Sequence, residues 1–213
     1  MNDYETKELD VIAKKINAHK SIIARYAKYL LEEFKDYELE EIMKWIESDN
    51  PDSPMVHGMN TEINLKGKII ANEIVKIKNP YTNEIIYLDI EMQATERKLE
   101  YPLPVRAEYY GDSLIVNQKK IEFTNDDYGK IKKVYTIWIV LDSYLENRNS
   151  IINRRIQPEI IYGENNLSRQ DVGKHADIMI YMSDKSLDHP VTRMIYDIFI
   201  KQETYAQKQE TLK

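Results

Sequence analysis

The residues from Val134 to Leu141 limit the fold of this chain more than any other feature of its sequence. They form an uninterrupted run of aliphatic, aromatic and threonine side chains that contains no charge. Short runs rich in β-branched and aromatic residues are typical of strands that are buried on both faces. The run therefore predicts the central strand of a sheet, and other elements must cover that sheet on both sides.

Four further segments have the character of helices. From Ile12 to Phe34, apolar residues recur every three or four positions, which is the spacing of an amphipathic helix. Pro102 and Pro104 mark the start of another, because proline is tolerated in the first turn of a helix. The sequence predicts helices over residues 12–34, 39–46, 104–117 and 191–205.

Two segments rich in Ile and Val, Lys68–Ile77 and Asn83–Gln93, have the composition of strands. The residues between them include an Asn-Pro pair that favours a turn, so we expect an antiparallel hairpin. Weaker strand candidates are residues 151–161 and 176–182. The order of helices, hairpin, helix and strand predicts an α/β fold with a mixed central sheet flanked by helices, in one domain over residues 1–213.

Composition narrows the function. The chain has no cysteine, so a disulfide framework, a thiolate zinc site and a cysteine nucleophile are excluded, and any metal must be bound by oxygen or imidazole. No segment is apolar over a membrane-spanning length, and we expect a soluble cytoplasmic protein that does not bind membranes. The net charge of -6 disfavours binding of nucleic acid through bulk charge, but a carboxylate site that holds a cation reverses its own local potential.

The second strand of the predicted hairpin carries the polar residues of most interest. Asp89, Glu91 and Gln93 alternate with apolar residues, so they project from one face of the strand. A half-exposed strand with a solvated face has the same pattern and is, on the alternation alone, the more common explanation. A catalytic interpretation needs further evidence.

That evidence is a resemblance carried by short sequence words in a fixed order, which are Ser21–Tyr29, Glu33–Tyr37, Gly58–Glu62, Gly67–Ile69 and Lys132–Ile139. Through these words the chain, from about Ile22 to about Ser183, resembles the PD-(D/E)XK nuclease family transposases, in the recombination-promoting nuclease branch. The resemblance implies a restriction-endonuclease-like core over residues 58–183, with N-terminal helices over 1–50 and a C-terminal helix over 189–213.

The resemblance also implies roles for two residues of the strand. Glu91 corresponds to the acidic metal ligand of the family, and Gln93 stands where a lysine is more usual and would position a water or the phosphate. The implied cofactor is Mg²⁺, with Mn²⁺ as a substitute, because both suit oxygen ligands. DNA is the implied partner, no organic cofactor is implied, and a homo-oligomer is compatible with the sequence.

The chain departs from the family in the preceding strand, where relatives carry Asp shortly after the Gly-Lys-Ile word. Counting from Gly67 puts Asn72 at that position, whereas a shift of one residue puts Glu73 there. Asn is a neutral and poor ligand for Mg²⁺, while Glu can bind it. Both alignments stay open, and they separate an active enzyme from an impaired one.

Arg106 and Tyr110 match an Arg and a Tyr that the family has on the helix after the hairpin. Their spacing of four places them on one helix face, where they would contact phosphate, or where Arg would simply stack on Tyr. Basic groups that could line a path for DNA are Arg97–Lys98, Lys119–Lys120, Lys130 with Lys132–Lys133, and Arg154–Arg155.

Together these features predict a metal-dependent DNA endonuclease, a hydrolase of phosphodiester bonds of a recombination- or transposase-associated type, which is weakened at its first acidic position if Asn72 and not Glu73 stands there. The alternative is a catalytically impaired nuclease-fold protein that acts as a binding or regulatory module. Asn72 and the acidic net charge favour the alternative.

Overall fold

The computed structural model describes residues 11–56, 60–65, 68–119, 121–164, 167, 173–183 and 188–201, with only the backbone described for 60–65 and 68–73. The helices are α2 (Lys20–Leu30), α3 (Leu39–Trp45), α4 (Leu103–Asn117) and α5 (Pro190–Ile195), with a 3-10 turn η1 (Tyr128–Lys130) and a π-helical turn η2 (Tyr196–Ile200). The strands are β1 (Asn60–Leu65), β2 (Lys68–Lys78), β3 (Ile85–Thr95), β4 (Lys133–Asp142), β5 (Ser150–Arg155) and β6 (His175–Tyr181).

The strands form one mixed sheet in the order β1-β2-β3-β4-β6-β5. Neighbours β1, β2 and β3 are antiparallel, as are β5 and β6, whereas β4 runs parallel to both β3 and β6. Parallel neighbours need a crossover connection, and α4 supplies the one between β3 and β4. The predicted α/β class, with a mixed central sheet flanked by helices, is confirmed.

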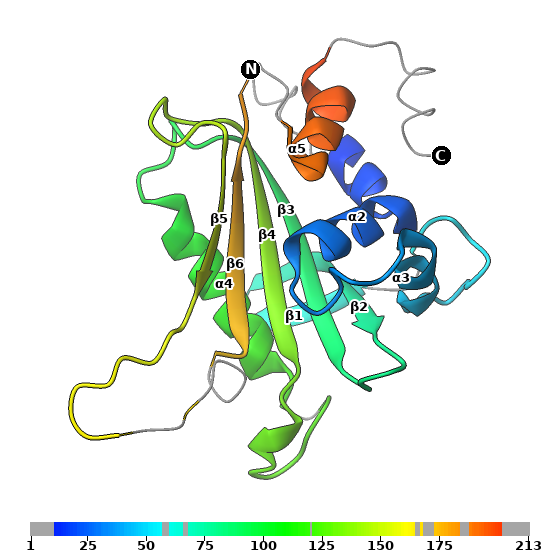
Figure 1. The fold of residues 1–213 in the computed structure, drawn as a ribbon, viewed down its shortest axis with the longest axis vertical. Helices are drawn as coiled ribbons and strands as arrows, with labels where there is room; N and C mark the ends of the chain where they lie inside the picture. Colours follow the sequence, from blue (N-terminus) through cyan, green and yellow to red (C-terminus); the bar gives the residue numbers. More distant parts are fainter. Residues whose placement is uncertain are drawn as a thin grey trace.

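Helices cover the sheet on both faces (Figure 1). One layer contains α2, α3 and α5, and its side chains join the main apolar core together with Leu88, Ile137 and Ile139. The other layer is α4, which packs Leu103 and Ala107 against the opposite face of the sheet. Every described side chain from Val134 to Val140 is buried, as the uncharged run predicts.

The hairpin of β2 and β3, the helix that ends at Asn117 and the central strand lie where the sequence predicts them. The predicted helix from Ile12 to Phe34 is wrong as a single element. Helical structure stops at Ala18, where the backbone bonds to another segment instead: the amide of Val56 donates to Ala18 at 2.8 Å, and the amide of Lys20 donates to Pro54 at 2.8 Å. These long-range bonds replace continuation of the helix.

Three other expectations about the elements are corrected. The strand predicted over residues 151–161 ends at Arg155, because the following segment, which contains Pro158, leaves the sheet. The closing helix becomes a π-helical turn after Ile195, and residues beyond 201 lie outside the described part. Strand β1 was not predicted, although the alternation in Thr61–Leu65 is a weak strand signal.

One glycine sets how closely α4 approaches the sheet. A Cβ atom at Gly111 would overlap the imidazole ring of His175 on β6. That ring cannot easily turn aside, because its two nitrogens are held by Asp112 at 3.2 Å and Asp177 at 2.7 Å. Glycine is therefore required at this position by the close packing of the helix on the ring.

Replacing Gly111 by Ala should destabilise the protein, although alanine favours a helix. Overpacking of a filled contact costs about 1–3 kcal/mol, which exceeds the roughly 1 kcal/mol that Ala offers over Gly in a helix interior. Urea unfolding monitored by circular dichroism measures the change. Gly129→Ala is the matched control, because its new Cβ would lie 3.9 Å from its nearest neighbour and should change little. Equal stability of both variants would contradict the packing argument.

Candidate functional site

Strand β3 presents its polar residues to the face that α4 covers. Tyr87 packs with Leu114 of α4, while Leu88 packs in the core on the opposite face. Side chains alternate along a strand, so Asp89, Glu91 and Gln93 lie on the same face as Tyr87. Asp89 is buried with 1% of its surface exposed, whereas Glu91 and Gln93 are half-buried. The site is thus a polar strip that opens toward its Glu91 end.

Arg106 of α4 lies against two aromatic side chains near the polar strip. Its guanidinium is 5.2 Å from the centre of the Tyr110 ring and 5.3 Å from that of Trp138, and Nη2 donates to the Tyr110 hydroxyl at 3.3 Å. Trp138 is the residue paired with Glu91 in the parallel ladder of β3 and β4. The predicted sharing of one helix face by Arg106 and Tyr110 is confirmed, and the guanidinium lies against both rings, whose centres are 5.6 Å apart.

The electrostatics of this contact keep Arg106 charged. Burial alone would lower the pKa of Arg106, but the hydrogen bond to Tyr110, the charge effects of Tyr110 and Tyr101 and, least of all, the charge of Glu91 outweigh burial and raise it. Arg106 is therefore a permanent cation, and its charge interacts with that of the Glu91 carboxylate.

Gln93 has one fixed hydrogen bond within its own strand. Its side-chain Nε2 donates to the backbone oxygen of Thr95 at 2.8 Å. This bond orients the amide group, and the remaining oxygen is the part of Gln93 that accepts hydrogen bonds or ligates a metal.

The structure places the backbone of the two alternative ligand residues but not their side chains. In the antiparallel ladder of β1 and β2, Asn72 pairs with Thr61 and Glu73 pairs with Asn60. Which side chain shares a site with Glu91 stays a prediction. Within the described residues, His, Asp and Glu side chains form no group of three that could hold a metal ion.

A buried polar network under α4 was not predicted. Asp177 on β6 is its centre: one carboxylate oxygen accepts from the Thr136 hydroxyl at 2.8 Å and contacts His175 at 2.7 Å, and the other pairs with Arg154 at 3.0 Å. His175 also reaches Asp112 of α4 at 3.2 Å. The network links α4, the helix that carries Arg106, to strand β6 of the sheet. It therefore helps to fix the position of Arg106 relative to the candidate site.

The sequence contains weak indications of this network. Thr136 is the one residue of the central run that has a hydroxyl group without an aromatic ring, and His175 and Asp177 alternate with apolar residues in β6. No spacing rule links residues so far apart along the chain, because the sheet brings them together only through the β4–β6 ladder, in which Thr136 pairs with Asp177.

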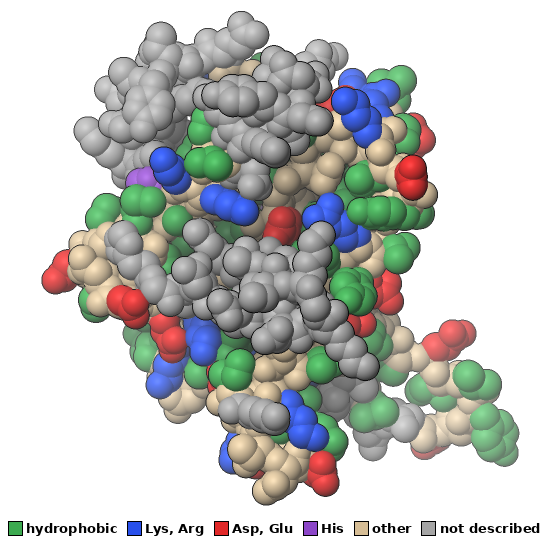
Figure 2. All heavy atoms as spheres, turned by 180° about the vertical axis from the view of Figure 1, so that it is seen from behind, with side chains coloured by type: hydrophobic (Ala, Val, Ile, Leu, Met, Phe, Trp, Pro, Cys, Tyr) green, Lys and Arg blue, Asp and Glu red, His purple; other side chains and the backbone are tan. Residues whose placement is uncertain are grey.

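Four residues of the predicted basic groups are paired with carboxylates, and they are Arg97, Lys130, Lys133 and Arg154. Arg97 bonds to Asp142 at 3.0 Å, and Lys133 bonds to Glu33 at 2.6 Å. Arg154 belongs to the network already described. Figure 2, which views the side of α4, shows acidic and basic side chains interspersed there. Within the described residues, the expected basic path for DNA is therefore partly neutralised.

Comparison with known proteins adds no relative: the chain matches no model of a protein family, no curated protein and no solved structure. None of the helices in the described part is both long and apolar enough to span a membrane. Function must therefore be argued from the residues of the site.

The network predicts how stability depends on pH. Burial alone lowers the pKa of His175, but hydrogen bonds and charge from Asp177 and Asp112 overcome it, so the folded-state pKa lies above the ordinary value of 6.5. The stabilisation from protonated His175 is thus fully present below that value and is lost as the pH rises through the raised folded-state pKa.

Thermal unfolding of wild type and His175→Gln over a pH series tests this. The stability difference between the two proteins should be largest at acid pH and should shrink as the pH rises above neutrality. Asp112→Asn, which removes one of the two carboxylates, should reduce the pH dependence without abolishing it. A difference that is constant with pH would show that His175 is neutral in the folded protein.

Proposed function

We propose that this chain is a metal-dependent DNA endonuclease with a restriction-endonuclease-like core, weakened at its first acidic position. The observation that carries the proposal is the position of Glu91 and Gln93 on β3, on the face covered by α4, where Arg106 lies over Trp138, the ladder partner of Glu91. The resemblance predicts this order of parts: a hairpin with the acidic strand, then a helix that carries Arg106 and Tyr110. Strands β2 and β3 and helix α4 follow one another in that order, which supports the proposal.

The hairpin register supports Asn72 over Glu73 as the partner of Glu91. Ile74 pairs with Asp89. If the same antiparallel register continues for two residues, position 72 falls opposite position 91. Alternation along the strand also puts Asn72 in phase with Ile74, which belongs to the cluster under α4. We therefore expect the neutral Asn72, and not Glu73, at the first ligand position.

The available donors fit Mg²⁺ in kind, because they are carboxylate and amide oxygens. Glu91 would supply the anionic ligand, and Asn72 and Gln93 would supply neutral oxygens. When bound, the ion supplies Lewis-acid stabilisation of the phosphate and lowers the pKa of a water. Gln93 would accept a hydrogen bond from the attacking water, and Arg106 would attract the DNA phosphate toward Glu91. With only one anionic ligand from the hairpin, metal binding would be weak.

A second function is favoured by the same register. If Asn72 stands at the ligand position, the chain can bind DNA near Arg106 without cutting it, as a binding or regulatory module. Both functions would use the same surface around Glu91 and Arg106. They differ only in whether the residue at position 72 carries a negative charge. Substitution at position 72 therefore distinguishes them directly.

A plasmid-nicking assay with Mg²⁺ and Mn²⁺ tests the proposal. Wild type should cut slowly, and Asn72→Asp should increase cutting by roughly a hundredfold, because a group aimed at the reacting centre is typically worth that much. Glu91→Ala should abolish cutting in both backgrounds, because the ion loses its anionic ligand. Glu73→Ala, which changes the neighbouring residue in the same strand, is the matched control and should have little effect.

Other outcomes of the assay decide between the alternatives. Loss of cutting in Glu73→Ala, with no gain in Asn72→Asp, would place Glu73 at the ligand position. Retarded migration of DNA that depends on Arg106, with no cutting in any variant, would support the binding module. Wild-type cutting that survives Glu91→Ala would overturn the nuclease proposal.

A further inference from the structure

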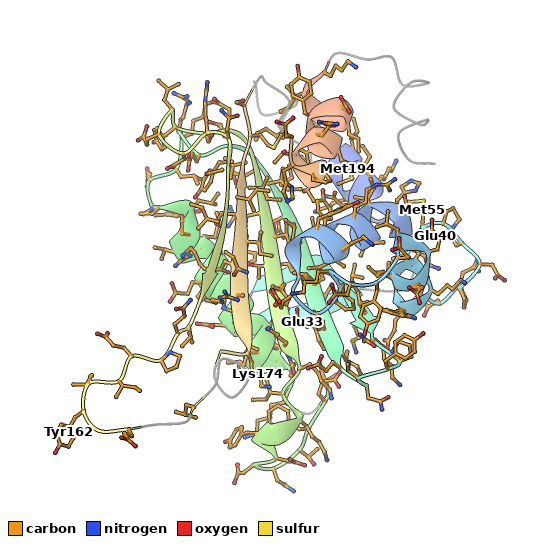
Figure 3. The ribbon with its side chains drawn as sticks, in the orientation of Figure 1. Glu33, Glu40, Met55, Tyr162, Lys174 and Met194 are labelled. Carbon is orange, nitrogen blue, oxygen red and sulfur yellow. The ribbon has the colours of Figure 1, made fainter. Side chains whose placement is uncertain are left out.

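A polar depression lies at the ends of β3, β4 and β6 where these strands start. The end of β5 and the segment after α2 complete its walls. Its volume is about 600 Å³, which is within the range of pockets that hold a small ligand. Figure 3 shows Glu33 and Lys174, two of its lining residues, near this end of the sheet. Three carboxylates and four cations line the depression, so the order of these charges determines what it can bind.

The charges in the middle of the depression are paired with one another or with neighbours. Glu33 is bonded to Lys133 of β4 at 2.6 Å, and it also accepts a hydrogen bond from the Tyr135 hydroxyl at 3.0 Å. Glu32 is paired with Lys35 at 2.5 Å. The middle of the depression is therefore close to neutral.

The remaining charges lie toward the two ends of the depression. Glu84 precedes β3, whereas Lys174 precedes β6 and Arg155 ends β5. None of these three forms an ion pair with a residue in the described part of the chain. Lys132, before β4, lies close enough to Glu122 for their charges to interact. One carboxylate at the β3 end and two cations at the β6–β5 end are thus open to a ligand.

The strand ladders place these charges on one face of the sheet. Arg155 is directly opposite Ala176, whose side chain packs in the core that α2 covers, and opposite residues share a face. Lys174 lies two residues before Ala176, and Glu84 lies two residues before Ile86 of the same core. Because side chains alternate, both belong to that face, in agreement with their place in the lining. Across the face the charge is negative at β3, neutral at β4 and positive at β6 and β5.

Strand spacing determines how far apart the charged ends are. Neighbouring strands lie about 4.8 Å apart. In the order β3-β4-β6-β5, two spacings separate β3 from β6 and three separate it from β5, or about 10 and 14 Å. An extended chain of three or four residues spans roughly the same lengths. A matching ligand therefore has a cation and an anion at opposite ends of a chain of this length.

We propose that the depression binds a short peptide of three or four residues through its two free termini. The N-terminal ammonium pairs with Glu84, and the C-terminal carboxylate pairs with Lys174 and Arg155 through charge-assisted hydrogen bonds. The uncharged middle of the peptide lies over the neutral pair of Glu33 and Lys133. An anion of the same length would bring negative charge to Glu84, and like charges repel.

This inference goes beyond the proposed nuclease function and does not depend on it. The depression is on the face of the sheet that α2 covers, whereas Glu91 and Arg106 are on the face that α4 covers. Variants of the depression should therefore leave any cutting or binding of DNA unchanged, and Glu91→Ala should leave peptide binding unchanged. Failure of one proposal is thus distinguishable from failure of the other.

Titration of ¹⁵N-labelled protein with trialanine, followed by nuclear magnetic resonance, measures the binding. The amide signals of the lining residues Gly173 and Ala176 should shift as the peptide is added. Acetylation of the N-terminus or amidation of the C-terminus should each weaken binding about fivefold, as expected for the loss of an ion pair at a partly exposed site. Dialanine should also bind more weakly, because its extended length of about 7 Å does not span the two ends.

Variants assign each terminus to its end of the depression. Glu84→Gln should remove the preference for free over acetylated trialanine and keep the preference for free over amidated trialanine. Lys174→Gln combined with Arg155→Gln should have the opposite effect. Glu40→Gln and Lys44→Gln are the matched controls, because they remove the same charges from exposed residues of α3 that do not line the depression. Both controls should bind trialanine as the wild type does.

Any of three results would overturn the peptide site. The signals of Gly173 and Ala176 would not move at millimolar trialanine, or the free and blocked peptides would bind equally well. Alternatively, pyrophosphate, an anion without a positive end, would bind more tightly than trialanine, which would show that the depression holds anions instead. Circular dichroism of each variant separates loss of the site from loss of the fold.

Discussion

Strand β4 buries side chains against two different helical layers, and the rest of the structure is arranged around this requirement. Ile137 and Ile139 face the layer of α2 and α5, whereas Trp138 and Val140 face α4. An uncharged strand can be stable only where both of its faces are covered. Because β3 is bonded in parallel to β4, the same arrangement sets Glu91 beside Trp138, under the helix that carries Arg106.

Hydrogen bonds fix the position of α4 on the sheet more exactly than apolar packing alone does. Apolar side chains would tolerate small sliding of α4 over the sheet, but hydrogen bonds from His175 to Asp112 and Asp177 do not, because their strength depends on geometry. Gly111 allows the close approach that these bonds need. The buried network therefore determines where α4 lies, and hence how near Arg106 stands to Glu91.

The net charge and local ion pairs limit the attraction of this protein to phosphate. The chain carries a net charge of -6, and cations such as Arg97 and Lys133 are paired with Asp142 and Glu33, so bulk attraction to phosphate is weak. In the proposed nuclease, attraction would instead come from a bound cation at Glu91 and from the stacked Arg106.

The local sequence pattern was sufficient to predict the kinds of elements and the strip of polar candidate residues on β3. The uncharged run predicted β4, the Ile- and Val-rich segments predicted the hairpin, and alternation put Asp89, Glu91 and Gln93 on one face. These features depend on residues a few positions apart. The break after Ala18, the early end of β5 and the network around Asp177 depend on contacts between distant segments. Only the tertiary structure decided these features. The hydrogen bonds that override the local tendency to form a helix or strand come from residues far away in the sequence, and a pattern of neighbouring residues cannot identify them.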